Sequence, residues 1–134
     1  MGRWKMELDT DRVHDVVTVR FEDCVLNTAE DVARWQQEIS GHLGVFGRKV
    51  DLLINLDGLV VKVPAGRAFG TARREVLEKF TNRSFRFGGD ALTRSFVSTS
   101  GMITGADVNT YDTREAALKA LLAAREKASR KAPR

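Results

Sequence analysis

The dipeptide Asp57-Gly58 directly follows a run of apolar residues in the segment NLDGLVVKVPAGRAFG. In proteins that alternate strands and helices, ligands bind at the carboxyl ends of the strands, so a carboxylate at this place could do chemistry. If Asp57 accepted a phosphoryl group, further carboxylates would be needed nearby to hold Mg²⁺. The only candidates at the end of an earlier predicted strand are Glu22 and Asp23. Asp-Gly is also a common turn dipeptide, so both a chemical and a turn-forming role are open to Asp57.

The second candidate is the turn Gly88-Gly89-Asp90, which precedes a predicted helix and is flanked by Arg86 and Arg94. Exposed backbone amides at the start of a helix attract anions. The spacing matches neither the dinucleotide-binding nor the phosphate-binding glycine fingerprint, so an ordinary tight turn is the alternative. A ligand held here would be a small anion or the carboxylate of an acyl chain.

Neither Cys24 nor His14 has the neighbours that catalysis needs, because a nucleophile requires a base and an orienting group. Cys24 stands between Asp23 and Val25, a setting that would raise the pKa of its thiol. A single cysteine also excludes an intramolecular disulfide and a cysteine-type zinc site. We therefore predict a protein that is not an enzyme and needs no cofactor or metal.

Strands and helices alternate along the chain in the predicted order β-β-α-β-α-β-α-β-α. This order predicts an α/β fold with a mostly parallel sheet and right-handed crossovers, preceded by an antiparallel N-terminal hairpin. The expected elements are a hairpin within residues 4–21 that turns at Thr10-Asp11, a helix over 28–43, a strand over 50–56, a helix from Pro64 to Phe80, a strand over 84–87, a helix over 92–103, a strand over 108–111 and a helix from residue 112.

The positive charge of the chain is unevenly distributed. The last ten residues hold five Lys and Arg against one Asp or Glu, and the other 124 residues are neutral overall. We expect one domain over 1–124, a disordered basic tail over 125–134, and no binding of nucleic acid. Residues 1–61 are acidic and 62–94 basic on balance, which suits contact with other proteins. No apolar run approaches the roughly 20 residues that span a bilayer, so we expect no membrane span and a cytoplasmic protein.

The first half of the chain resembles the STAS fold, which is found in anti-sigma-factor antagonists and in the C-terminal domains of sulfate transporters. The resemblance lies in the hairpin, the helix over 28–43, the strand VDLLINL that ends at Asp57-Gly58, and the helix from Pro64. The later segments RFGGDALTRSFVSTSGM and VNTYDTREAALKALL are similar to the SpoIIAA-like branch, which also resembles the lipid-carrying CRAL-TRIO domains. The residues of the second segment that fit this branch are Tyr111, Asp112, Glu115, Ala116 and Ala117.

The resemblance implies a regulatory domain whose partner is a protein, with a phosphorylatable serine just after the buried strand. The matching place here is Asp57-Gly58-Leu59, and neither Ser nor Thr occurs from Asn55 to Gly70. The first hydroxyl belongs to Thr71, inside the predicted helix. A phosphoserine works by placing a near-dianion at a helix start or an interface, so this switch cannot operate here.

We therefore expect a docking module that binds a protein partner and can form a homodimer. Its expected contact residues are Asp57, Gly58, Val60, Val61, Arg67, Arg73 and Arg74. Exposed Val60, Val61 and Val63 would mark a contact site, and their burial in the core is the alternative. The second hypothesis is a carrier of a lipid-like or anionic molecule, with its pocket near residues 86–103 and a lining of Phe87, Leu92, Phe96, Met102 and Ile103.

Overall fold

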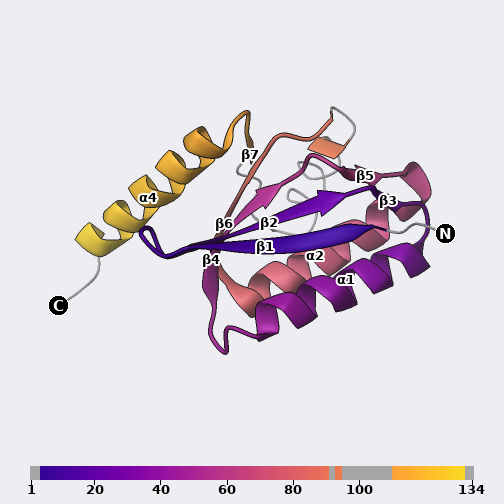
Figure 1. Cartoon of the computed structure of the whole chain (residues 1–134), viewed down its shortest axis with the longest axis horizontal. Coiled ribbons are helices and arrows are strands. Elements are labelled where there is room, and N and C mark those ends of the chain that lie inside the picture. The colour runs from indigo at the N-terminus through magenta and orange to yellow at the C-terminus, as the bar shows by residue number, and fades with distance from the viewer. Residues whose placement is uncertain (1–3, 91–92, 95–109, 132–134) are drawn as a thin grey trace.

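The computed structural model describes residues 4–90, 93–94 and 110–131. Its main sheet has the strand order β1-β2-β4-β6-β7, and the first pair is antiparallel while the other pairs are parallel. The strands of this sheet are β1 (Lys5–Asp11), β2 (Val16–Glu22), β4 (Val50–Asn55), β6 (Thr81–Phe87) and β7 (Thr110–Tyr111). The predicted α/β fold with a mostly parallel sheet and an N-terminal hairpin is thus confirmed (Figure 1).

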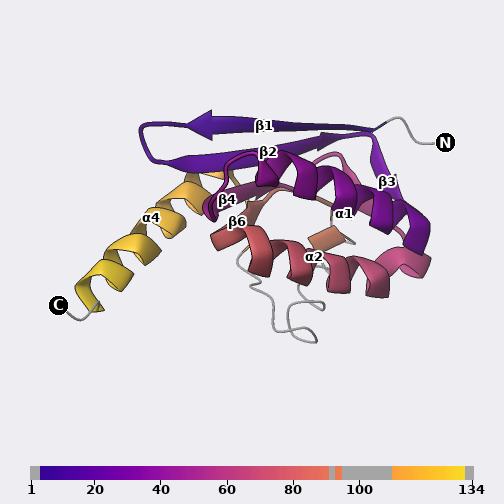
Figure 2. The same cartoon turned by 90° about the horizontal axis from the view of Figure 1, so that it is seen from below.

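Helices cover the sheet on both sides. Helices α1 (Ala29–Gly44) and α2 (Gly66–Phe80) lie side by side on one face, and the short 3-10 helix η1 (Val63–Ala65) leads into α2. Helix α4 (Arg114–Lys131) lies on the other face, as Figures 1 and 2 show together. None of the described helices is long and apolar enough to cross a membrane.

Two apolar clusters hold these layers together. Between the sheet and the helix pair, the rings of Trp35 and Phe69 lie 5.2 Å apart, and Leu52 packs into the same cluster. On the other face, Leu53 packs with Leu121 of α4. Because successive side chains of a strand point to opposite faces, β4 must be apolar on both, which explains its nearly continuous apolar run.

The start of α1 follows from its sequence. The backbone amide of Asp31 donates to the hydroxyl of Thr28 over 3.2 Å, and the Asp31 carboxylate accepts from the Thr28 amide over 3.2 Å. This is the reciprocal capping box that the segment TAED predicts. It fixes where the chain leaves β3 (Cys24–Leu26) and becomes helical.

The hairpin turn lies later than predicted. Strand β1 continues to Asp11, and the turn occupies residues 12–15, so His14 is in the turn instead of a strand. The Asp11 carboxylate accepts from the backbone amide of His14 over 3.1 Å, and the left-handed φ of 52° at Asp15 reverses the chain. Because β1 is an edge strand with one solvent-facing side, its polar residues do not end it.

Apart from residues 93–94, the third predicted helix lies outside the described residues, as does most of the expected carrier lining. Of the five lining side chains named above, only Phe87 is described. Strand β6 begins at Thr81, three residues before the predicted start.

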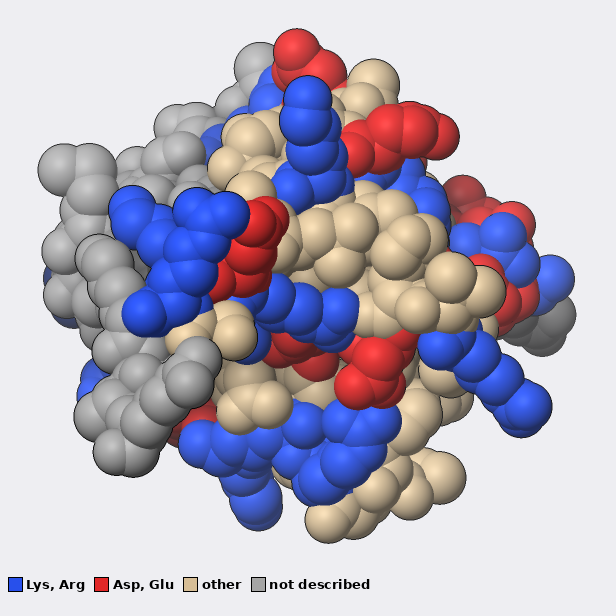
Figure 3. Space-filling view, turned by 90° about the vertical axis from the view of Figure 1, so that its left-hand side faces the viewer, with Lys and Arg blue, Asp and Glu red and all other residues tan. Residues whose placement is uncertain are grey.

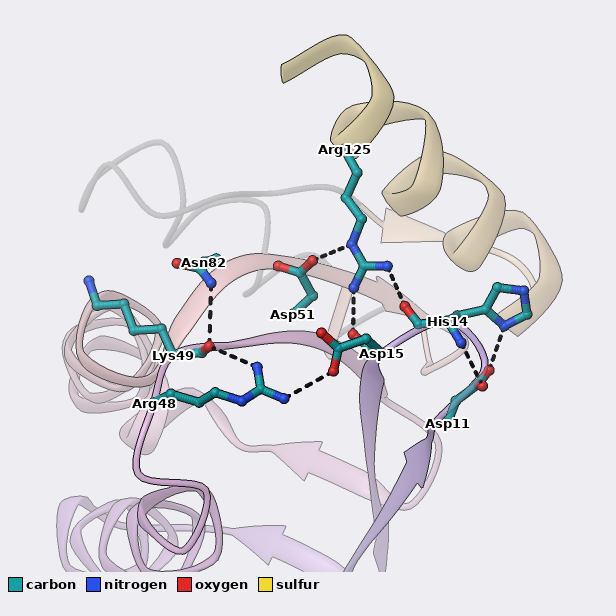
Figure 4. A network of polar contacts seen from close by, with 8 residues as sticks. All are labelled: Asp11, His14, Asp15, Arg48, Lys49, Asp51, Asn82 and Arg125. Carbon is teal, nitrogen blue, oxygen red and sulfur yellow. Dashed lines mark hydrogen bonds and ion pairs between the residues drawn. The ribbon is translucent and has the colours of Figure 1, made fainter. Parts of the chain in front are cut away.

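Helix α4 extends beyond the predicted domain boundary. The sequence favoured a disordered segment from residue 125, whereas the helix runs to Lys131. The side chain of Arg125 explains the difference, because its Nε lies 2.6 Å from the Asp51 carboxylate and its other nitrogens donate to the backbone carbonyls of His14 and Asp15 (Figure 4). One side chain thereby ties α4 to β4 and to the hairpin turn.

Candidate docking site at the carboxyl edge of the sheet

The turn that follows β4 is constrained by close contacts. The side-chain oxygen of Asn55 accepts from the backbone amide of Asp57 over 2.9 Å. Gly58 has a φ of +80°, and a Cβ atom there would lie 2.2 Å from the carbonyl oxygen of Phe21. Only glycine fits both the left-handed conformation and this close approach to β2.

The two turns singled out in the sequence meet at this edge. The amide of Gly89 donates to the Asp57 carboxylate over 2.8 Å, and a Cβ atom on Gly88 would lie 2.8 Å from the same carboxylate. Both glycines have left-handed φ angles. The anion at the predicted anion-binding turn is thus the chain's own Asp57, which gives this carboxylate a structural role.

The two arginines of the predicted anion site, Arg86 and Arg94, lie in different environments. Arg86 is fully buried, because strand alternation turns it toward the helix pair while Phe85 and Phe87 face α4. Arg94 stays at the edge, where its guanidinium lies 3.1 Å from the Asp112 carboxylate. Arg86 is thus not exposed beside the turn, and its part in an anion pocket stays a prediction.

The interior beside Arg86 is closely packed. Its cavity measures about 20 Å³ and is lined by Arg86, Arg73 and apolar side chains that include Trp35 and Phe69. Such a volume suits one water molecule and excludes an acyl chain. The predicted carrier pocket near residues 86–103 lies mostly outside the described residues and stays a prediction.

The valines after the turn differ in exposure. They belong to strand β5 (Leu59–Val61), which pairs in parallel with β3 and was not predicted. Alternation along β5 buries Val61 completely and leaves Val60 half-buried. Val63, beyond the strand, is 72% exposed. Val61 is therefore a core residue, whereas Val63 is fully available for contact and Val60 only in part.

The arginines of α2 also differ. Arg67 and Arg74 are exposed, and Arg74 pairs with Glu78 over 3.1 Å. Arg73 is only 3% exposed, so its place in the predicted contact surface was wrong. The spacing contained this signal, because position 73 lies one helical turn after Phe69 on the apolar stripe.

A shallow polar pocket of about 370 Å³, which was not predicted from the sequence, lies on the face that carries α4. Its lining includes Asp9 from β1, Arg20 from β2 and Arg114 from α4. The charged groups largely satisfy one another, since Arg20 pairs with Glu7 over 2.7 Å and Arg114 with Asp11 over 3.6 Å. These residues belong to no common sequence motif, and only the folding of the chain brings them together.

The groups considered for catalysis lie apart. Cys24 is buried in β3, and burial, with a smaller contribution from the charge of Glu38, raises the pKa of its thiol to about 12. His14 lies in the hairpin turn, with its Nδ1 2.8 Å from the Asp11 carboxylate. Glu22 is exposed and pairs with Lys5 over 3.8 Å. Within residues 4–90, 93–94 and 110–131, no three His, Cys, Asp or Glu side chains are placed to hold a metal ion.

Comparison with known proteins gives matches at the level of structure. No family model matches the sequence, and neither does any curated protein. Two solved structures of SpoIIAA, one of the phosphorylated Bacillus cell fate determinant and one of the unphosphorylated anti-sigma factor antagonist, superpose with a TM-score of 0.53 each. They are 18% and 17% identical to this chain, cover 87% and 89% of it, and are themselves covered over 99% and 97% of their length.

A third structure gives the same result. It is an uncharacterized DUF3478-family protein with a SpoIIAA-like fold from Shewanella loihica PV-4, with a TM-score of 0.56 and 14% identity over 89% of this chain and 94% of that one. The chain has the SpoIIAA-like fold. The expectation drawn from the STAS resemblance is thus confirmed for the architecture. In this SpoIIAA-like domain the turn after β4 carries Asp57-Gly58-Leu59 and no hydroxyl.

Proposed function

We propose that this SpoIIAA-like domain is a non-enzymatic regulatory module that binds another protein at the carboxyl edge of its sheet. The proposed contact surface, called the turn–helix surface, consists of Asp57, Gly58, Val63, Pro64, Arg67 and Arg74. The observation that carries the proposal is Val63, a large apolar side chain left 72% exposed at the entry to α2 beside the exposed Arg67. An exposed apolar side chain gains free energy when a partner covers it, and arginine is enriched at protein interfaces.

The rigidity of the surrounding turns supports this function. Gly58 is held against β2, and the Gly89 amide is bonded to Asp57, so the edge is ordered before a partner arrives. Binding to a preorganised surface costs less conformational entropy than binding to a flexible loop.

We further propose that docking at this edge is not switched by phosphorylation of the turn. No Ser or Thr lies between Asn55 and Gly70, and the exposed Thr71 belongs to α2 itself. Control would then lie in the abundance or state of the partner. We place the protein in the cytoplasm, since its one cysteine is free and buried, as suits a reducing compartment.

The turn–helix surface is tested by isolating the tagged full-length chain and its partners from its native cells. We expect a protein partner that is retained by the wild type and lost, with affinity reduced at least roughly tenfold, from the double variant Val63→Asp, Arg67→Glu. The matched control is Val13→Asp, which changes a valine in the hairpin turn that is even more exposed than Val63. Equal retention of the partner by both variants would contradict this surface, and recovery of only a second copy of the chain would identify a homodimer.

A further inference from the structure

We propose that the opposite end of the molecule binds the surface of an anionic lipid bilayer. This end, called the basic end, consists of residues 12–15, 45–51, 79–83 and 125–130 and faces the viewer in Figure 3. The inference goes beyond the proposed docking function and uses a separate surface.

The net positive charge of the basic end is larger than that of the complete chain. Its four segments contain eight Lys and Arg against three Asp and Glu, a net charge of +5, whereas the complete chain carries +4. All three acidic side chains, Asp15, Asp51 and Glu126, are engaged in ion pairs within this end. This surface therefore attracts negatively charged ligands.

Contacts between segments distant in sequence bring these charges together. Arg48, after α1, lies 3.0 Å from the Asp15 carboxylate of the hairpin turn. The side chain of Asn82 donates to the carbonyl of Lys49 over 3.3 Å, and Arg125 of α4 binds the hairpin turn from its other side (Figure 4). The hairpin, the α1–β4 connection, the start of β6 and α4 thus form one surface.

Two apolar side chains stand out among the charges of the basic end. Val13 in the hairpin turn is 89% exposed, and Val45 at the end of α1 is 84% exposed. Arg12 directly precedes Val13 in the sequence, and Arg48 follows Val45 by three residues. In Figure 3, uncharged surface extends between Lys and Arg side chains on this face. Apolar side chains on loops, surrounded by cations, suit the boundary between lipid headgroups and acyl chains.

A shallow pocket lies within the basic end. It measures about 270 Å³ and is lined by Arg48, Lys49, Lys79 and Phe80 together with Leu43, Gly44 and Gly47. The ammonium of Lys79 lies 5.3 Å from the centre of the Phe80 ring. No ion pair among the described residues uses the ammonium of Lys49 or Lys79. Both cations are available to the phosphate of a lipid headgroup.

The valines favour a bilayer over other anionic partners. A nucleic acid, or a peptide of acidic residues alone, would satisfy the cations but would gain nothing from Val13 and Val45. A bilayer uses both, since each basic side chain near an anionic surface strengthens binding roughly fivefold and buried apolar surface adds to it.

The test is co-sedimentation of the full-length protein with phosphatidylcholine vesicles that contain about 30 mol% phosphatidylserine, over a range of salt concentrations. We expect binding that weakens as salt increases and that is absent from vesicles of phosphatidylcholine alone. The double variants Lys49→Glu, Lys79→Glu and Val13→Ser, Val45→Ser should each lower the partition coefficient at least roughly tenfold, the second without any change in charge. The control Val63→Asp, Arg67→Glu changes a valine and a cation at the other end of the molecule, and this variant should bind as the wild type does.

Three results would overturn the proposal: no binding to the phosphatidylserine vesicles, equal loss in the control variant, or binding that depends on the lysines but not on the valines. The last result would show a general attraction to anions, and a polyglutamate peptide or duplex DNA that competes equally well would point to the same conclusion. The outcome is independent of partner docking, which the two valine substitutions of the basic end should leave intact.

Discussion

At the scale of single residues, a few positions with strict geometry hold the candidate docking site. Gly58 cannot carry a side chain, and the Asp57 carboxylate has its partner in the Gly89 amide. The Asp-Gly turn was predictable, because the dipeptide follows a buried strand. Its contact with Gly88-Gly89 follows only from the pairing of β4 with β6, which no single-residue signal shows.

The first prediction concerns Gly58. A Cβ atom at this position would lie 2.2 Å from the Phe21 carbonyl oxygen, in a left-handed backbone conformation. Replacement by alanine should therefore lower the free energy of unfolding by about 2 kcal/mol or more. The control is Gly41→Ala, since Gly41 lies within α1 with no atom near a new Cβ, and it should stabilise by about 0.5–1 kcal/mol. Urea unfolding measures both, and a neutral Gly58→Ala would show that the turn is not rigid.

Cys24 gives a prediction that depends on pH. Burial raises the pKa of its thiol from 9.0 to about 12, so the folded state favours the protonated form. The corresponding contribution to stability is complete below pH 9.0 and is lost as the pH rises toward about 12. A thiol reagent at about pH 9 should label the native protein far more slowly than the urea-unfolded protein, and equal rates would contradict the assigned environment.

At the scale of elements, periodicity predicted the helices over 28–43 and 64–80 well, because their apolar stripes pack on the sheet. It failed for the short β3 and β5, whose pairing with each other buries Val61. For the end of α4 the expectation came from composition, which suggested disorder, whereas the helix continues to Lys131. The contacts of Arg125 with Asp51 and the hairpin turn are tertiary, so local sequence could not reveal them.

The anchoring of α4 is open to a direct test. The substitution Arg125→Ala removes a close ion pair from the buried Asp51, whose remaining partner is Arg83 at 3.7 Å. Because a buried carboxylate is left poorly compensated, the free energy of unfolding should fall by about 2 kcal/mol. Hydrogen exchange should increase along α4 more than along α1.

The control for this substitution is Arg130→Ala, which breaks only an exposed pair with Glu126. Exposed ion pairs contribute little, so the free energy of unfolding should stay within about 0.5 kcal/mol of the wild-type value. Equal effects of the two substitutions would show that Arg125 does not anchor the helix.

At the scale of the whole molecule, the two ends of the sheet differ in chemistry. The carboxyl edge has rigid turns, an exposed Val63 and the paired Asp57, whereas the other end gathers cations around Val13 and Val45. The order of elements predicted the SpoIIAA-like fold, because strand and helix signals are local. From the sequence, the excess positive charge lies in the last ten residues. Only the folded chain shows that four separate segments together form one positively charged surface.

Native mass spectrometry of the protein purified from its own cells, first under gentle and then under denaturing conditions, tests the docking function most directly. We predict a stoichiometric complex with a protein, with no small-molecule adduct, that is lost in the Val63→Asp, Arg67→Glu variant and kept in Val13→Asp. A non-covalent small-molecule adduct that disappears on denaturation, with no protein bound, would contradict docking and favour a carrier. A phosphate that survives denaturation and whose removal changes partner binding would contradict the absence of a phosphorylation switch.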